Sequence, residues 1–201
     1  MALYIISGFA QSGKTTLISL LLKDPNIVRI ITSTTRKPRE GEKDKIDYYF
    51  LKEEDFKDKT KFLETAIVHG NYYGTLIEEV KNKLKLQKKV VWNLDVQGVD
   101  FILKNHKDID KEIITIFITP AKFSTLIQRI RLKGDSNGEQ RIESIRKELK
   151  YLPLYKYMVN SSNKIDESLD DLKGIIFNDK EKLRKAEELM KNFNVDKFLR
   201  S

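Results

Sequence analysis

Two segments near the start of the chain carry residues whose types and spacing suit phosphate chemistry. Residues 8–15 read Gly-Phe-Ala-Gln-Ser-Gly-Lys-Thr and fit the pattern Gly-x4-Gly-Lys-[Ser/Thr] of a phosphate loop. Residues 32–42 contain Arg36 and Arg39, whose planar guanidinium groups suit a phosphate dianion. The first segment suits a nucleoside triphosphate, and the second suits another phosphate. Together they predict an enzyme that moves a phosphoryl group between two nucleotides.

The phosphate loop needs a strand before it and a helix after it. Its glycines let consecutive N–H groups curl around phosphate oxygens, and a helix N-terminus favours anions. Residues 3–7 are an apolar run that predicts a buried strand, and the leucines after Lys14 predict a helix that ends near residues 24–25. Lys14 is expected to reach the β- and γ-phosphates, and the Thr15 hydroxyl to ligate Mg²⁺. The predicted ATP-binding residues of this segment are Gly8, Phe9, Ala10, Gln11, Ser12, Gly13, Lys14, Thr15 and Thr16.

Strands and helices alternate along the rest of the chain. Apolar runs predict further core strands at 27–31, 89–94, 113–118 and 156–160. Helical patterns follow at 97–105, up to about 131, at 139–152, and from about Ser168 through most of the tail. Residues 32–87 are polar and rich in Tyr and Thr, which predicts an inserted small sheet with a helix at 76–85. This order predicts an α/β fold of three layers around a five-stranded parallel sheet.

Composition excludes several classes of protein. With 201 residues the chain suits one domain with a real core, and no run of about 18 apolar residues predicts a membrane span. The net charge of +8 comes from 38 basic and 30 acidic residues that are interleaved, so we do not expect nucleic acid as the main partner. The absence of cysteine excludes disulfides and thiolate catalysis, and it fits a cytoplasmic location.

At this point the chain resembles the guanylate kinases, which phosphorylate GMP with ATP. Five motifs occur in that family's order and spacing, and the resemblance covers about residues 3–180: they are residues 32–42, 47–50, 62–64, 70–75 and 95–98. The resemblance implies a P-loop kinase fold in one domain, 1–201. It divides this domain into a core of residues 1–31, 88–122 and 147–201, a GMP-binding insert of mixed β structure at 32–87, and a short lid at 123–146.

The same resemblance implies roles at the GMP site. Arg36, Arg39, Tyr48 and Tyr73 would hold the GMP phosphate. Glu64 would accept hydrogen bonds from guanine N1–H and the exocyclic amine. The remaining GMP-site residues are Thr32 and Thr75, which would donate to O6, together with Asn93 and Asp95, the latter also near Mg²⁺ through a water. A carboxylate beside hydroxyl donors complements guanine and rejects adenine, whose six-position is a donor.

On the ATP side, the resemblance implies that a lid folds over the phosphates. Arg129 and Arg141 fall at positions where the family carries lid arginines, and Asn160 falls at one that lies near the adenine. With Lys14, Arg36 and Arg39, the two lid arginines complete the predicted catalytic set, which would neutralise charge as the γ-phosphoryl group moves. No general base is needed, because the second pKa of a phosphate monoester is about 6.

The chain departs from the family's pattern at several positions. Gln11 stands where the loop usually has a glycine, and a positive φ there would make glutamine costly. Asn93 replaces an aspartate, and Lys133 replaces a lid arginine. Residues 161–162 are serines where two aspartates are usual, and the lid is about three residues shorter.

The resulting hypothesis is Mg²⁺-dependent phosphorylation of GMP and dGMP by ATP, in a monomer or homodimer. Three alternatives stay open. The first is a kinase for another phosphorylated acceptor. The second is a non-catalytic module of kinase-like fold. The third is a nucleic-acid binder, whose affinity would depend steeply on salt.

Overall fold

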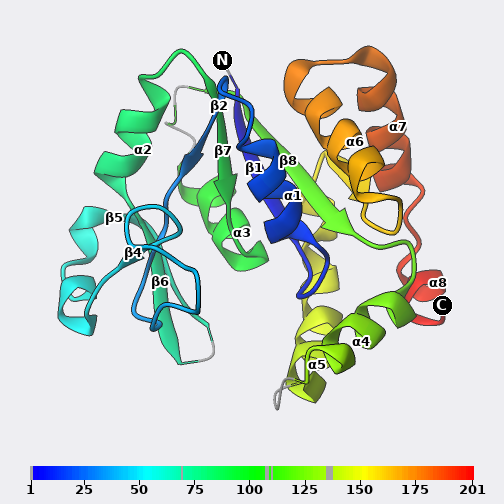
Figure 1. Ribbon diagram of the computed structural model, residues 1–201, viewed down its shortest axis with the longest axis horizontal. Coiled ribbons are helices and arrows are strands. Elements are labelled where there is room, and N and C mark those ends of the chain that lie inside the picture. The colour runs from blue at the N-terminus through cyan, green and yellow to red at the C-terminus, as the bar shows by residue number, and fades with distance from the viewer. Residues whose placement is uncertain (1, 69, 107–108, 110, 135–137) are drawn as a thin grey trace.

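Five parallel strands form the central sheet of the computed structural model, which describes residues 2–68, 70–106, 109, 111–134 and 138–201 (Figure 1). The order of its strands is β2-β7-β1-β8-β9. Their bounds are β1 Leu3–Gly8, β2 Ile27–Ile30, β7 Lys89–Asn93, β8 Ile113–Thr119 and β9 Tyr157–Asn160. All pairings in this sheet are parallel, which confirms the predicted sheet.

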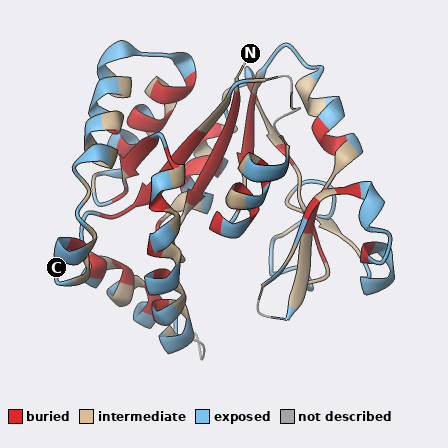
Figure 2. Cartoon of the chain, turned by 180° about the vertical axis from the view of Figure 1, so that it is seen from behind, coloured by how far each residue is buried: buried red, intermediate tan, exposed pale blue. Residues whose placement is uncertain are grey.

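Helices cover both faces of the sheet, so the core has the three predicted layers. On one face, residues of β1, β7 and β8 pack against α3 (Val96–Asn105), α4 (Phe123–Leu132) and α5 (Gly138–Glu148). On the other face they pack against α1 (Lys14–Leu21), α6 (Ile165–Phe177) and α7 (Lys180–Lys191). Figure 2 shows the strands as a buried centre between these helices. Strands buried on both faces explain the continuous apolar runs of the sequence.

The register of the sheet places the phosphate loop. β1 lies between β7 and β8, with Ile6 opposite Asn93 and Gly8 opposite Ile118. All three strands therefore end at the same edge, where ligands bind in open α/β sheets. The loop after β1 and the residues that follow Asn93 meet at this edge.

A second sheet lies in the region predicted as an insert. It has the order β4-β3-β6-β5 and is mixed, because β3 pairs parallel with β4 and antiparallel with β6. Its strands are β3 Ser33–Thr34, β4 Tyr49–Phe50, β5 Phe62–Val68 and β6 Asn71–Leu76. Two 3₁₀ turns, at Glu53–Phe56 and Lys59–Lys61, precede β5, and α2 (Ile77–Leu84) follows β6. Glu79 of α2 accepts hydrogen bonds from the Ile31 amide and the Tyr49 hydroxyl, and so joins the insert to the end of β2.

The tail differs from the prediction of one long helix from Ser168. α6 begins at Ile165 and ends before Asn178, which adopts a left-handed conformation with φ of 66°. Asp179 then caps α7 through its side chain, and α8 (Val195–Leu199) follows. The single-helix prediction was wrong because Asn178 and Asp179 form a helix end and a helix start side by side.

The predicted helix at 139–152 is also shorter in the structure. α5 ends at Glu148, and a 3₁₀ segment, Leu149–Leu154, continues to the last strand with Pro153 inside it. Residues 135–137, within the predicted loop at 133–138, lie outside the described residues. Among the helices that are described, none is long and apolar enough to cross a membrane.

Candidate active site

The phosphate loop has the backbone that its glycines predict. A Cβ on Gly8 would collide with the Ile118 carbonyl oxygen, so only glycine lets β1 approach β8 here. Gly13 has φ of 88° and stands at the N-cap of α1. Gln11 has φ of 60°, which meets the condition under which a non-glycine residue is costly at this position.

The loop residues divide into those that pack and those that face the cavities. Phe9 is only 1% exposed and meets the ring of Phe117 edge-on at 4.7 Å, so its backbone alone is available to a nucleotide. Ser12 is also buried, whereas Thr15 and Thr16 at the start of α1 are exposed. The predicted ligand roles of these residues stay predictions.

Lys14 lies half-buried at the edge of the sheet. Its Nζ donates to the Gly8 carbonyl oxygen at 3.2 Å. Burial lowers the pKa of the Lys14 ammonium, while Glu148 and Asp95 act in the opposite direction. Lys14, Asp95 and Glu148 line one cavity of about 250 Å³. A positive charge held between two acids at the end of β1 is suited to contact a phosphate that enters this cavity.

Arg129 bridges α4 to the core. Its guanidinium donates to the Gln11 carbonyl oxygen at 3.4 Å and to the Ser161 carbonyl oxygen at 3.0 Å. Arg129 lines a second cavity of about 490 Å³ beside the phosphate loop, together with Gln11, Gly13, Thr16 and Lys133. The fold thus brings two residues of the predicted lid next to the predicted ATP loop. They are Arg129 and Lys133, the lysine that stands where the family has a second lid arginine.

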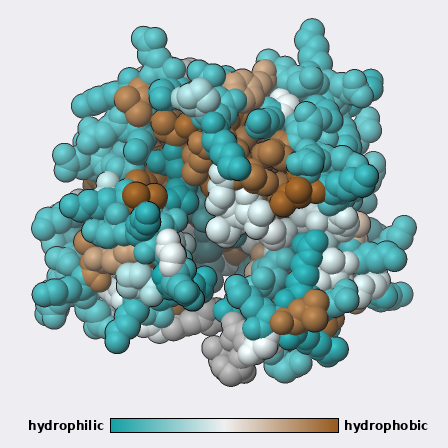
Figure 3. All heavy atoms as spheres, viewed as in Figure 1, coloured by the Kyte–Doolittle hydropathy of each residue, from teal (hydrophilic) through white to brown (hydrophobic). Residues whose placement is uncertain are grey.

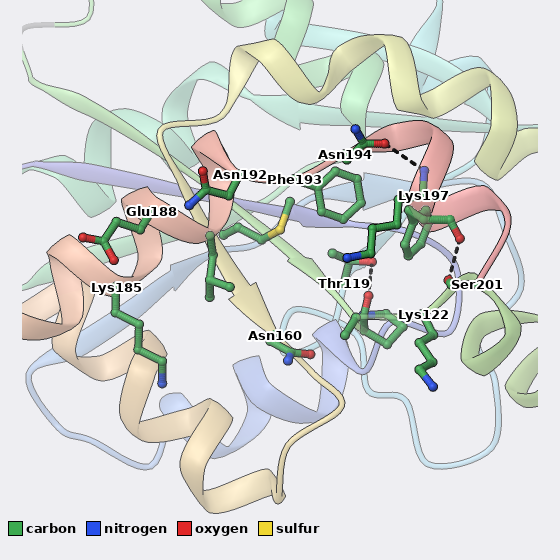
Figure 4. A pocket seen from close by; sticks show the side chains of 15 residues that line it. Thr119, Lys122, Asn160, Lys185, Glu188, Asn192, Phe193, Asn194, Lys197 and Ser201 are labelled. Carbon is green, nitrogen blue, oxygen red and sulfur yellow. Dashed lines mark hydrogen bonds between the residues drawn. The ribbon is translucent and has the colours of Figure 1, made fainter.

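Two other predicted residues of the ATP side lie elsewhere. Asn160 accepts a hydrogen bond from the Ser162 amide at 2.9 Å, and it lines a third cavity, of about 590 Å³, beside the C-terminal helices (Figure 4). It therefore shapes the loop that supplies Ser161 to the second cavity. Arg141 is half-buried on α5. Their proposed contacts with ATP stay predictions.

A buried hydrogen-bond chain stands on the insert side of the 250 Å³ cavity. The Thr75 hydroxyl donates to Oε1 of Glu64 at 2.7 Å, and the Trp92 indole N–H donates to the Thr75 oxygen at 3.2 Å. Burial raises the pKa of Glu64 to about 7, although the bond from Thr75 opposes that rise. The Thr75 proton that was predicted to bind guanine O6 is bonded to Glu64 here, and it orients the Glu64 carboxylate. Trp92, which the sequence predicts as core packing, is fully buried, and its indole N–H sets the direction of this series of hydrogen bonds.

Tyrosines and arginines form the rest of the insert side. Tyr48 and Tyr73 line the cavity with Thr32, and the two rings lie 6.3 Å apart. Arg36 stacks over Tyr48 at 5.4 Å and donates to both oxygens of Glu42 at 2.9 Å. Arg39 is exposed, and its backbone amide donates to Glu42. Glu42 therefore holds the two-arginine segment in shape, with Arg36 closest to the cavity residues.

The ends of β7 and α5 complete the cavity. Asn93 and Asp95 both line it, as the sequence predicts for a GMP site. Oδ1 of Asp95 caps α3 by accepting from the amides of Gln97 and Gly98 at 2.8 and 3.0 Å. Glu148 was missed by the sequence analysis. It accepts from Ser144 at 2.8 Å, and only its position at the last turn of α5 brings it opposite Lys14.

The two sides of the site enclose one hollow. In Figure 3 the molecule is hollowed between the part that carries the insert and the part that carries α4 and α5. The 250 Å³ cavity joins residues of the phosphate loop, the insert and α5. This fold and site define a nucleotide kinase of the P-loop class.

Comparison with known proteins agrees with this class. The family model described as guanylate kinase matches residues 1–179. The chain belongs to the guanylate kinase family.

Three curated relatives extend the match over most of the chain, and each carries the name guanylate kinase. That of Fusobacterium nucleatum is 38% identical over 88% of this chain and 96% of its own length. That of Clostridium tetani is 38% identical over 87% and 84%, and that of Rickettsia prowazekii is 41% identical over 77% and 80%. The crystal structure of guanylate kinase from Anaplasma phagocytophilum has a TM-score of 0.69 at 23% identity, covering 88% of this chain and 85% of that one. This structural likeness supports the fold alone.

Proposed function

We propose that the protein transfers the γ-phosphoryl group of ATP to GMP, which yields ADP and GDP. The observation that carries this proposal is that Lys14 and Glu64 line the same cavity. One is the lysine of the phosphate loop, and the other is a buried carboxylate with free acceptor capacity. A single cavity can therefore hold an acceptor whose phosphate meets the donor and whose base meets Glu64.

Selection of guanine rests on the chemistry of Glu64. When ionised, its carboxylate accepts from guanine N1–H and the exocyclic amine, whereas adenine offers no matching pair of donors. A site whose buried polar groups would be left unpaired by the wrong base discriminates strongly. The residues assigned to GMP address the base and the phosphate, so we extend the proposal to dGMP.

Catalysis would consist of alignment and charge neutralisation. Lys14 would contact the β- and γ-phosphates, and Arg36 with Arg39 would hold the acceptor phosphate. Arg129 and Arg141 would face the charge that develops on the transferred group. Because the acceptor oxygen is already ionised near neutral pH, no side chain has to remove a proton from it.

Magnesium is the proposed metal cofactor. The Thr15 hydroxyl and the Asp95 carboxylate are hard oxygen donors of the kind that Mg²⁺ prefers. Oδ1 of Asp95 accepts both capping bonds, which leaves Oδ2 for a water on the ion. Within the described residues no group of three or more His, Cys, Asp or Glu could hold a metal. That suits an ion bound mainly through nucleotide phosphates and water, which would neutralise charge on the β- and γ-phosphates.

We further propose that the insert 32–87 and the lid 123–146 close on the core when both nucleotides bind. The support is that residues of the insert line the 250 Å³ cavity with Lys14, whereas Arg129 and Lys133 of the lid line the separate cavity beside Gln11 and Gly13. Small-angle scattering with a bisubstrate analogue should show compaction, and unchanged dimensions would contradict closure. A cytoplasmic location and a monomeric or homodimeric state remain expectations.

The direct test is ADP release from Mg·ATP with GMP, dGMP, AMP, UMP and CMP in parallel. Activity confined to GMP and dGMP supports the proposal. Activity with a different acceptor would favour another kinase specificity. ATP binding without turnover of any acceptor would favour a binding module, and Lys14→Ala should then abolish that binding.

A further inference from the structure

The C-terminal segment contacts the start of the lid helix. The family match ends at residue 179, and residues 194–201 lie beyond it. Figure 1 shows α8 and the C-terminus beside α4. The N-cap residue of α4, Lys122, makes no side-chain cap. The first amides of this helix are satisfied by residue 201 instead of by a local side chain.

Ser201 makes these bonds with two different atoms. Its Oγ accepts from the Phe123 amide at 3.0 Å, and its carbonyl oxygen accepts from the Ser124 amide at 3.1 Å. The same Oγ donates to the Phe198 carbonyl oxygen at 2.6 Å, a bond drawn in Figure 4. One side chain thus ties the end of α8 to the beginning of α4. Asn194 caps the other end of α8 by accepting from the Lys197 amide at 2.8 Å.

Phe198 connects the same segment to the phosphate loop. It is 3% exposed, and its ring stacks on Phe9 with centroids 5.9 Å apart and an interplanar angle of 21°. Its ring also lies 5.6 Å from that of Phe123 and 5.0 Å from that of Phe193. Phe198 therefore contacts the first residue after Gly8 and the first residue of α4 together. Aromatic pairs of this kind stabilise a contact beyond what their buried area alone contributes.

α4 carries Arg129 six residues after its first position. At about 1.5 Å of rise per residue, this arginine sits about 9 Å along the helix axis from Phe123. Its guanidinium donates to Gln11 and Ser161 across the second cavity. A tilt or fraying of the helix start would displace that guanidinium from the phosphate loop.

From these contacts we infer that residues 194–201 form a clasp that sets the position of α4 relative to the phosphate loop. Phe198 and Ser201 are its positioning residues, and they act on ATP through Phe9 and through Arg129. The kinetic part of this inference rests on the proposed function, whereas the structural part does not. Among the contacts of the clasp with described residues given above, none involves a residue assigned to GMP.

Two substitutions test the clasp. Ser201→Ala removes the Oγ acceptor of a helix cap and should speed hydrogen exchange of the Phe123 amide about fivefold. Phe198→Ala should raise KM for ATP and should lower kcat, each by about tenfold. The reason is that a small displacement of the Arg129 guanidinium or of the phosphate loop costs this much or more. KM for GMP should not change. Phe198→Leu keeps most of the apolar volume and should restore most of the activity.

Leu183→Ala is the matched control, because Leu183 of α7 packs on the opposite face of the sheet. It should lower stability without separating KM for ATP from KM for GMP. The inference is overturned if exchange at the start of α4 stays at the wild-type rate in Ser201→Ala, or if Leu183→Ala shifts the two KM values as Phe198→Ala does. Should Phe198→Ala not fold, Ser201→Ala and Phe198→Leu carry the test. Hydrogen exchange needs no turnover, so a failed kinase assay leaves it interpretable.

Discussion

The Thr75 hydroxyl donates its proton at 2.7 Å to Oε1 of Glu64, and Glu64 lines the same cavity as Lys14. Glu64 is 5% exposed, and Thr75 is fully buried. The Trp92 indole N–H donates to the Thr75 oxygen, so the Thr75 hydroxyl proton is left to point at the Glu64 carboxylate. The carboxylate of Glu64, the proposed acceptor for guanine, is thus oriented by Thr75 and by Trp92 of the core strand β7.

The first prediction concerns the pH dependence of GMP use. Burial raises the pKa of Glu64 to about 7, and only the ionised form accepts from both guanine donors. Therefore kcat/KM for GMP should fall about tenfold per pH unit below this pKa and level off above it, since kcat/KM reports groups of the free enzyme. Glu64→Gln should flatten the profile and lose about 100-fold at pH 8. The exposed Glu54→Gln serves as the control and should keep the wild-type profile.

The same raised pKa predicts a pH dependence of stability. The folded state holds the Glu64 proton more tightly than the unfolded state, whose pKa is near 4.5. The contribution of protonated Glu64 to the free energy of unfolding is therefore complete below pH 4.5 and is lost as the pH rises to about 7. The difference corresponds to roughly 3 kcal/mol, from the shift and 1.36 kcal/mol per unit. Urea unfolding between pH 5 and 8 should show this decline in the wild type and a flatter curve in Glu64→Gln. Parallel curves for the two proteins would contradict it.

Arg129 is predicted to act on the phosphoryl transfer step. Arg129→Lys keeps a positive charge but cannot donate to both the Gln11 and Ser161 carbonyl oxygens from one planar group. We expect kcat to fall by ~10³, the lower end of the effect of an arginine at a transferring phosphate, with a smaller change in KM. Arg131→Lys on the exposed side of the same helix is the control. An equal fall of kcat in the two variants would contradict a specific role of Arg129 in phosphoryl transfer.

Gln11 carries a conformational cost that a glycine would relieve. Its φ of 60° lies in the left-handed region, where a residue with a side chain is disfavoured by about 1–2 kcal/mol. Glycine loses more backbone entropy on folding, about 0.5–1 kcal/mol. Gln11→Gly should therefore stabilise the protein by roughly 0.5–1 kcal/mol in denaturant unfolding. Gly13→Ala, at a φ of 88°, should destabilise it, and a stabilised alanine variant would contradict the argument.

Arg36 is predicted to bind the acceptor phosphate as a fork. Nη2 of Arg36 donates to both carboxylate oxygens of Glu42, so the guanidinium plane is oriented before GMP binds. Arg36→Lys should raise KM for GMP about tenfold and leave KM for ATP unchanged, because a lysine cannot make paired contacts. Lys37→Ala, at an exposed neighbouring position, should leave both values unchanged. A rise in KM for ATP alone would place Arg36 at the other nucleotide.

Much of this protein was predictable because its signals are local. Residues 8–15 specify a loop between a strand and a helix, and the apolar runs specify strands buried on both faces. The sequence also marked Gln11 as a position where a positive φ would be costly, because that cost depends on its own segment; the structure supplied the φ of 60°. The tail was mispredicted because Asn178 ends one helix immediately before Asp179 starts another, and an apolar stripe continues across that break.

The sequence by itself determined the class of fold and the phosphate loop, and it supplied the residue types of the two proposed nucleotide sites. Only the tertiary structure decided how those residues serve one another. Thr75 points its proton at Glu64 because Trp92, from another sheet, occupies its oxygen. Ser201 caps α4 from 78 residues away, and Glu148 meets Lys14 across the cavity. Such pairings depend on how separate elements pack, and no periodicity along the chain records which distant side chain will satisfy a given hydrogen-bond donor.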